Sequence, residues 1–273
     1  IIFKTGGIML TTNFLKARTS TRDFKDEKVD DEKIKKIYQI TRELENKFGE
    51  KDLHYQVNNK GEEVYFKLKG NAGYKGVMIK APLYVALDIT NDSKSALVKG
   101  AYGLEELITK LSELGLASCY ITVSGVSDDI LKSAFVNAEG KIMSILAIGE
   151  ATKQEIREHR YDDRKGINEF VFIDDLDHKA SVEELSQRGL DDLFSYLRFA
   201  PSSYNSQPWR FVLKDNFVNL YLEDYKDEAN LVDAGIVMYY FDQLTKEISI
   251  NSIWEVEPKL DGSKYQFIAQ KEL

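Results

Sequence analysis

The chain has 273 residues, 43% hydrophobic and 30% charged, which is the balance of a globular protein long enough to bury a large core. Its formal net charge of −8 argues against nucleic acid as a partner, because an acidic chain gains nothing from phosphate counterion release. The single cysteine, Cys119, excludes an intrachain disulfide, the three histidines show no metal-ligand spacing, and no apolar run is long enough to span a bilayer. We therefore expect a cytoplasmic protein without a metal site, a membrane partner or a nucleic-acid partner. Ile1–Ile8 resemble neither a signal peptide nor part of a fold, so Met9 is expected as the natural start.

The first half of the chain is predicted to alternate helices with short strands. Apolar residues at helical spacing mark the helices, and short apolar or alternating runs mark the strands. The predicted helices cover 30–48, 94–114 and 128–135, and the predicted strands cover 53–57, 63–68, 83–89, 119–123 and 141–148.

A charged stretch at 151–180 is the predicted linker, with a short strand at 170–173 inside it. The next helix is predicted at 181–199, with Ser181 as its cap, Glu184 at the capping-box position and Pro201 as its stop. The elements expected after it are strands at 210–213 and 218–222, a helix at 228–246, and strands at 248–253 and 265–269.

The order of elements repeats along the chain. Ala96-Leu-Val-Lys-Gly100 opens the long helix of the first half, and Asn230-Leu-Val-Asp-Ala-Gly235 opens its counterpart 134 residues later. We interpret this as two degenerate copies of one α+β unit in one compact body, residues 9–150 and 181–273. The alternative is chance, because helices and strands can be ordered in few ways.

The segment 200–211 reads Ala-Pro-Ser-Ser-Tyr-Asn-Ser-Gln-Pro-Trp-Arg-Phe. Pro201 ends a helix, and several hydrogen-bonding side chains then follow in one irregular turn. Such a loop suits a planar heteroaromatic ligand with carbonyls and ring nitrogens along one edge. The alternative interpretation is an ordinary connection between a helix and a strand.

A second motif reads Arg18-Thr-Ser-Thr-Arg-Asp-Phe24. Two arginines four residues apart, with the Ser20 hydroxyl between them, can converge on one phosphate. Taken alone, the same run could be a solvated basic patch before a helix.

Together the two motifs resemble the FMN-dependent nitroreductase family, which carries an R-x-S-x-R-x-F opening and a P-S-x-x-N loop. The resemblance implies a nitroreductase-like α+β fold with antiparallel-rich central sheets flanked by helices. It also implies that the first motif grips the FMN phosphate and that the second contacts the ribityl chain and the isoalloxazine ring. The cofactor-binding residues carried over in this way are Arg18, Thr19, Ser20, Arg22, Pro201, Ser202, Ser203 and Asn205.

The spacing of the two motifs departs from the family. In the family both motifs lie in one unit of a homodimer, whereas here about 180 residues separate them. A fused pair of units that lost one half-motif from each copy would keep a single flavin site. We therefore expect a fused pseudo-dimer that is a monomer in solution, with a homodimer as the alternative.

The same resemblance implies weaker assignments. Ser124 and Gly125 would bring a backbone N–H close to flavin N5, although a plain strand end with a turn is the alternative. Tyr74 and Lys75 lie where the family contacts the pyrimidine edge of the ring. A further phosphate cation would come from Arg157, Arg160 or Arg164, each of which could also belong to a solvated linker.

The resemblance implies two-electron reduction of a small aromatic, nitro or quinone-like compound, with NADH or NADPH as the reductant. No side chain is expected to act as a catalytic acid or base, because the flavin carries the redox chemistry. Two alternatives stay open: a flavin-binding carrier or sensor without turnover, and a relative that modifies its flavin or dehalogenates its substrate.

Overall fold

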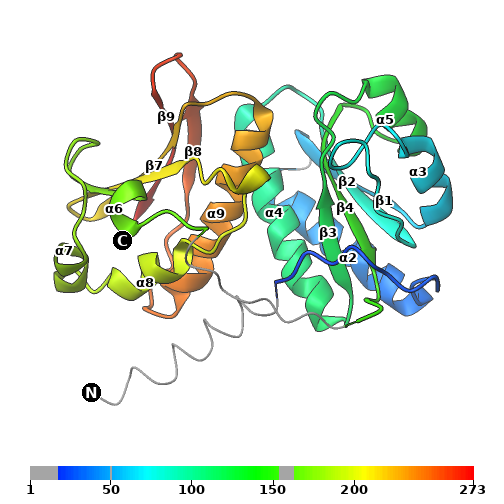
Figure 1. The fold of residues 1–273 in the computed structure, drawn as a ribbon, viewed down its shortest axis with the longest axis horizontal. Coiled ribbons are helices and arrows are strands. Elements are labelled where there is room, and N and C mark those ends of the chain that lie inside the picture. Colours follow the sequence, from blue (N-terminus) through cyan, green and yellow to red (C-terminus); the bar gives the residue numbers. More distant parts are fainter. Residues whose placement is uncertain (1–17, 50, 154–162) are drawn as a thin grey trace. The chain divides into compact units, whose positions relative to one another are not determined.

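The structure is a computed structural model that describes residues 18–49, 51–153 and 163–273 (Figure 1). The expected start at Met9 and the candidates Arg157 and Arg160 lie outside the described residues. The described residues fall into two compact units, one within Lys16–Arg157 and the other within Glu158–Leu273. We call them the N-terminal unit and the C-terminal unit.

The described part of the N-terminal unit is built on a four-stranded antiparallel sheet with the strand order β1-β2-β4-β3. Every residue of the central strand β2 is buried, so both faces of the sheet are covered. The strands are β1 (Leu53–Asn58), β2 (Leu83–Ile89), β3 (Ala117–Ile121) and β4 (Lys141–Gly149).

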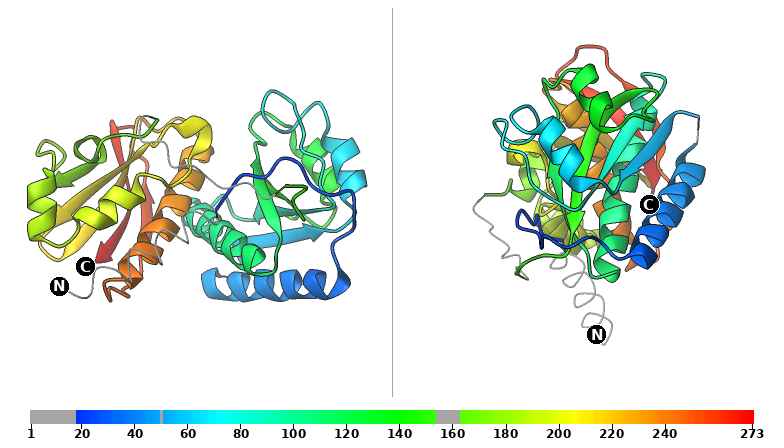
Figure 2. Two further views of the ribbon diagram at one scale, coloured as in Figure 1. Left: turned by 60° about the horizontal axis from the view of Figure 1, so that its bottom comes forward. Right: turned by 90° about the vertical axis from the view of Figure 1, so that its right-hand side faces the viewer.

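Helices α2 and α4 pack together on one face of this sheet, and α3 and α5 pack on the other (Figures 1 and 2). The helix α2 begins where the Asp30 side chain accepts hydrogen bonds from the backbone N–H groups of Glu32 and Lys33. Within the described ranges, none of the helices combines the length and the apolar composition that a membrane span requires. These helices are α2 (Asp31–Phe48), α3 (Gly61–Leu68), α4 (Lys94–Glu113) and α5 (Asp128–Ala134).

The C-terminal unit contains a five-stranded sheet with the order β5-β6-β7-β9-β8, in which only the β5–β6 pair is parallel among the described strands. The edge strand β5 falls inside the stretch expected as a linker and pairs with β6. The strands are β5 (Val171–Ile173), β6 (Trp209–Lys214), β7 (Phe217–Glu223), β8 (Glu255–Lys259) and β9 (Tyr265–Glu272).

An aromatic cluster forms the core between this sheet and its helices. The Phe211 ring on β6 stacks on the Phe241 ring of α9 at 5.6 Å and meets the Phe194 ring of α8 edge-on at 5.7 Å. All three side chains are fully buried, so they supply much of the packing that holds α8 and α9 on the sheet. The helices of this unit are α6 (Ile167–Phe170), α7 (Val182–Gln187), α8 (Asp191–Leu197), the 3₁₀ turn η1 (Ser203–Asn205) and α9 (Glu228–Lys246).

Four strands of each unit follow one topology. The order β1-β2-β4-β3 has the same antiparallel pattern as β6-β7-β9-β8, and the long helices α4 and α9 occupy the same place in the order of elements. The ladders also shift register at matching points, after Leu87 in β2 and after Leu220 in β7. The two units therefore share a chain path as well as an element order.

Three predicted elements were wrong. Residues 63–68 belong to helix α3, because Val64 and Leu68 are buried one helical turn apart and acidic residues occupy the first turn. The helix predicted at 181–199 is divided into α7 and α8, since Gly189 adopts φ +70° between them. The strand predicted at 248–253 lies instead at β8, because the chain leaves α9 through a left-handed Ser249 at φ +65°.

Candidate functional site

Arg18 belongs to a buried hydrogen-bond network in the N-terminal unit. Its Nε donates to Glu105 Oε1 on α4 at 3.0 Å, and its Nη1 donates to Ser20 Oγ at 2.9 Å. The Tyr120 hydroxyl on β3 donates to the other carboxylate oxygen, Glu105 Oε2, at 3.0 Å. Only 6% of Arg18 and 1% of Glu105 is exposed, so this is an ion pair within the core.

The strand-like segment that carries the first motif lies beside β3. Ser20 forms a parallel bridge with Ser118, and the Thr21 N–H donates to Ser118 O at 3.0 Å. Phe24 closes the segment by packing into the core and bridging to Ala151. These contacts fix the backbone of the motif at both of its ends.

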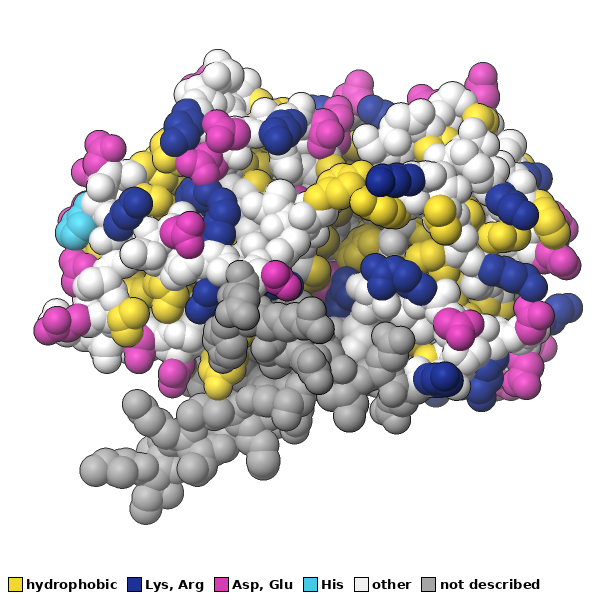
Figure 3. All heavy atoms as spheres, viewed as in Figure 1, with side chains coloured by type: hydrophobic (Ala, Val, Ile, Leu, Met, Phe, Trp, Pro, Cys, Tyr) yellow, Lys and Arg dark blue, Asp and Glu magenta, His cyan; other side chains and the backbone are white. Residues whose placement is uncertain are grey.

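Arg22 is exposed, and Thr19 is half-buried between the two arginines. Burial raises the pKa of the Cys119 thiol, while the positive charges of Arg22 and Arg18 act in the opposite direction. The positive charges of both arginines therefore influence the same residue of β3, Cys119. On the face seen in Figure 3, acidic and basic side chains are both spread over each unit.

This donor set fits a phosphate group. Two guanidinium groups and the Ser20 hydroxyl offer charge-assisted and neutral donors from one short segment. Glu105 neutralises part of that charge, which leaves Arg22 as the exposed cation. The phosphate end of FMN is thus compatible with the residues present.

The second motif forms a constrained loop in the C-terminal unit. After Ser202 the chain makes the 3₁₀ turn η1, in which Tyr204 and Asn205 have φ values of +52° and +56°. Gln207 also lies in the left-handed region, at φ +48°. Three such residues within four positions are costly for non-glycine residues and are maintained only where surrounding contacts hold them.

Gln207 supplies several of those contacts. Its backbone N–H donates to Ser202 Oγ at 3.0 Å, and its Oε1 accepts the Lys165 N–H at 2.9 Å. Gln207 Nε2 donates to Asp163 O at 3.2 Å, and Asn205 Nδ2 donates to the same carbonyl at 2.6 Å. The loop is therefore held against residues 163–165 on one side.

Asp233 supports the loop from the core. Its side chain, 1% exposed on α9, accepts the backbone N–H of Ser203 through Oδ1 at 2.8 Å. Oδ2 has no hydrogen-bond partner among the residues that the structure describes. Burial raises the pKa of this carboxyl to about 7, although the hydrogen bonds from Ser203 and Asn230 oppose the rise.

Pro201, Ser202 and Ser203 are half-buried, whereas Tyr204 and Asn205 are exposed. The first three residues of the loop are therefore partly covered, and the next two are open to solvent. Arg164, one of the candidate phosphate cations, donates through Nη1 to Ala200 O at 2.9 Å, directly before the loop. That contact gives Arg164 a role in holding the loop.

Ser124 and Gly125 form an exposed turn after β3, closed by a 3.1 Å hydrogen bond from the Val126 N–H to Val123 O. Gly125 has φ +79°, a conformation that favours glycine. The neighbouring Gly73 N–H donates to Thr122 O at 2.8 Å, which ties the loop carrying Tyr74 and Lys75 to this turn. The Tyr74 side chain is exposed there.

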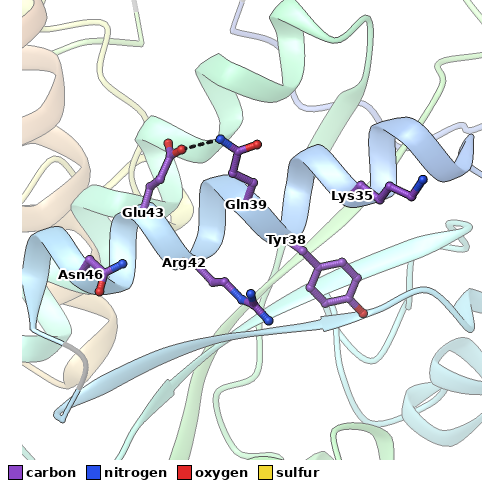
Figure 4. A pocket seen from close by; sticks show the side chains of 6 residues that line it. All are labelled: Lys35, Tyr38, Gln39, Arg42, Glu43 and Asn46. Carbon is purple, nitrogen blue, oxygen red and sulfur yellow. Dashed lines mark hydrogen bonds between the residues drawn. The ribbon is translucent and has the colours of Figure 1, made fainter.

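A shallow hollow elsewhere in the N-terminal unit contains no predicted site residue (Figure 4). All its lining residues come from α2, and within it Gln39 Nε2 donates to Glu43 Oε1 at 2.8 Å. We regard it as the solvated face of a helix. Its lining residues are Lys35, Tyr38, Gln39, Arg42, Glu43 and Asn46.

The structure thus gathers Arg18, Ser20 and Arg22 beside β3 in one unit, and residues 201–205 on one loop in the other. Sequence reasoning missed Glu105 and Asp233, which hold these two groups from the long helices. A signal existed for both, because each is an acidic residue on the apolar face of a predicted helix.

Comparison with known proteins gives the family. The sequence model of the family described as "Putative TM nitroreductase" matches residues 11–245. The chain belongs to this nitroreductase family. No match was found among curated proteins.

Solved nitroreductase structures resemble this family member. A "putative nitroreductase" from Thermotoga maritima is 18% identical, with 94% of this chain and 93% of that chain covered and a TM-score of 0.59. An FMN-dependent nitroreductase from Clostridium difficile is 21% identical, covering 55% of this chain and 93% of its own, with a TM-score of 0.47. A nitroreductase with bound FMN from Bacteroides fragilis is 18% identical, covering 55% and 92%, with a TM-score of 0.45. The Thermotoga likeness confirms the predicted nitroreductase-like α+β fold.

Proposed function

We propose that this nitroreductase-family chain is an FMN-dependent oxidoreductase that reduces a small aromatic, nitro or quinone-like compound by two electrons, with NADH or NADPH as the reductant. The observation that carries the proposal is the gathering of Arg18, Ser20 and Arg22 beside β3, a donor set that suits the FMN phosphate. Relatives described as FMN-dependent or as holding FMN support the choice of cofactor.

The residues of the chain would divide the binding of FMN. Arg18, Thr19, Ser20 and Arg22 would hold the phosphate. Pro201, Ser202, Ser203 and Asn205 would line the ribityl chain and the ring, from a loop that the Asp233 carboxylate and Gln207 keep in one conformation. The backbone of Ser124 and Gly125 would face the reactive edge of the ring, where a donor favours the electron-rich form. Bound FMN would supply the redox chemistry, and these residues would supply binding and orientation.

One FMN per chain follows from this division. The shared strand order of the two units supports an internal duplication, and each copy keeps only one of the two binding motifs. At the spacing of 134 residues that relates α4 to α9, Tyr239 takes the position of Glu105, so the second copy has no acidic residue at that position. We therefore propose a pseudo-dimer with a single site, active as a monomer.

The test is a flavin count followed by reduction. The purified chain should carry or bind one FMN, whose yellow absorption bleaches when NADH or NADPH is added and returns with a nitroaromatic or quinone acceptor. Bound FMN that neither nicotinamide reduces would instead support a carrier or sensor. Two FMN molecules per chain would refute the single site, and no binding would refute the proposal.

A further inference from the structure

We propose that Glu105 is a positioning residue that holds the Arg18 guanidinium in the orientation in which it contacts the FMN phosphate. The inference rests on the proposed function, because it concerns the same cofactor. It adds a residue from α4 that lies outside both sequence motifs.

The first argument is the fixed geometry of the carboxylate. Oε1 accepts Arg18 Nε at 3.0 Å, while Oε2 accepts the Tyr120 hydroxyl at 3.0 Å. Two separate partners fix the plane of the carboxylate. The plane of the carboxylate in turn fixes the orientation of the guanidinium plane. In that orientation, Arg18 Nη1 donates to Ser20 Oγ at 2.9 Å.

The second argument is the rigidity of the helix that carries Glu105. Tyr55 on β1 donates its hydroxyl to Gly100 O at 2.9 Å, which anchors α4 to the sheet. At Gly103 an added Cβ would lie 2.0 Å from Tyr55 Oη, so the helix approaches β1 as closely as a glycine permits. Glu105 therefore projects from a backbone that cannot shift easily.

The third argument is burial. A guanidinium that is 6% exposed needs a counter-charge to remain in the core without a ligand, and Glu105 supplies one. The Arg18 guanidinium carbon also lies 5.7 Å from the centre of the Tyr120 ring, which favours the same orientation. Glu105 and Tyr120 thus keep Arg18 ordered before the phosphate arrives.

Orientation and charge can be separated by substitution. Glu105→Ala removes the acceptor and the charge. Glu105→Gln removes the charge but keeps an acceptor oxygen for Arg18 Nε, and its amide NH2 can donate to the Tyr120 oxygen where Oε2 accepted before. Tyr120→Phe leaves the carboxylate but removes the hydroxyl that fixes it. The matched control is Glu106→Gln, the next residue on α4, whose carboxylate pairs with Lys47 at 2.8 Å.

The experiment titrates each full-length variant with FMN and with riboflavin and follows flavin fluorescence. Riboflavin has the same ring but no phosphate, so a residue that acts on the phosphate changes only FMN affinity. We expect Glu105→Ala to weaken FMN binding by about tenfold, the size of a lost hydrogen bond to a charged group, with riboflavin binding unchanged. Tyr120→Phe should weaken FMN binding by about threefold, less than Glu105→Ala, because the carboxylate keeps its contact with Arg18. Glu105→Gln should retain the FMN preference, and Glu106→Gln should match the original chain.

Equal losses for FMN and riboflavin in Glu105→Ala and Tyr120→Phe would overturn the inference, because they indicate a general structural role. A loss in Glu105→Gln as large as in Glu105→Ala would also overturn it. If Glu105→Ala fails to fold by circular dichroism, Tyr120→Phe decides, and an unchanged FMN preference there counts against Glu105. An original chain that binds neither flavin would refute the proposed function itself, whereas intact FMN preference in every variant would refute only the role of Glu105.

Discussion

The free energy of unfolding of Asp233→Asn, measured relative to the original chain, should increase as the pH rises. The Asp233 carboxyl is buried on α9, with Oδ1 on the Ser203 N–H and with a pKa raised to about 7. A raised carboxyl pKa means that the folded state keeps a proton that the unfolded chain releases above its ordinary pKa of 3.8. The free energy of unfolding therefore falls as pH rises from about 4 to about 7, and the penalty is complete above that range.

The magnitude follows from the two pKa values. Each pKa unit is worth 1.36 kcal/mol, so ionised Asp233 costs the folded state about 4 kcal/mol above pH 7. Asparagine keeps the acceptor for Ser203 but never ionises, although its Nδ2 introduces a buried donor with a cost of its own. The change with pH is therefore the test: the stability of Asp233→Asn relative to the original chain should rise by about 3 kcal/mol between pH 5 and pH 8.

Urea unfolding followed by tryptophan fluorescence reports on this unit, because both tryptophans, Trp209 and Trp254, lie in it. Asp215→Asn is the matched control, since Asp215 is exposed in the turn between β6 and β7 and its substitution should leave the pH profile unchanged. Parallel pH profiles for the original chain and Asp233→Asn would refute the reasoning. They would mean that Asp233 ionises in the folded state as readily as in water.

Further predictions concern the binding residues and the core. Arg18→Ala should weaken FMN binding by about 1.5–3 kcal/mol, the cost of a charged hydrogen bond, and unchanged affinity in a fluorescence titration would remove Arg18 from the site. Arg22→Ala should reduce the salt dependence of FMN affinity, because an exposed cation acts through a screened field; equal salt slopes would contradict this. Asn205→Ala should weaken FMN and riboflavin binding alike, since its loop is assigned to the ring side, and a loss confined to FMN would reverse that assignment. Phe211→Ala should destabilise the C-terminal unit by about 3–5 kcal/mol in urea, and a loss below about 1 kcal/mol would show that the aromatic core can collapse around the cavity.

Much of the fold could be predicted from periodicity and capping. The long helices were placed within one or two residues of α2, α4 and α9, and the Asp30 cap and the Ser181–Glu184 capping box are present. Residues 63–68 misled the prediction, because Val64, Phe66 and Leu68 alternate like a strand while Val64 and Leu68 also share a helical face.

The candidate site could be predicted only in part. Arg18 and Ser20 lie close in the sequence, so their contact follows from the motif. The contact between Arg18 and Glu105 spans 87 residues, and nothing in either segment specifies the other as its partner. Asp233 and Ser203 are similarly remote, since only the packing of α9 on η1 brings them together.

The close approach of α4 to β1 has a consequence for variation in this chain. Any side chain at Gly103 would push the helix away from Tyr55 and carry Glu105 with it, two residues further along. A methyl group at a position outside the proposed FMN-binding residues could therefore weaken FMN binding, and a screen limited to those residues would overlook it.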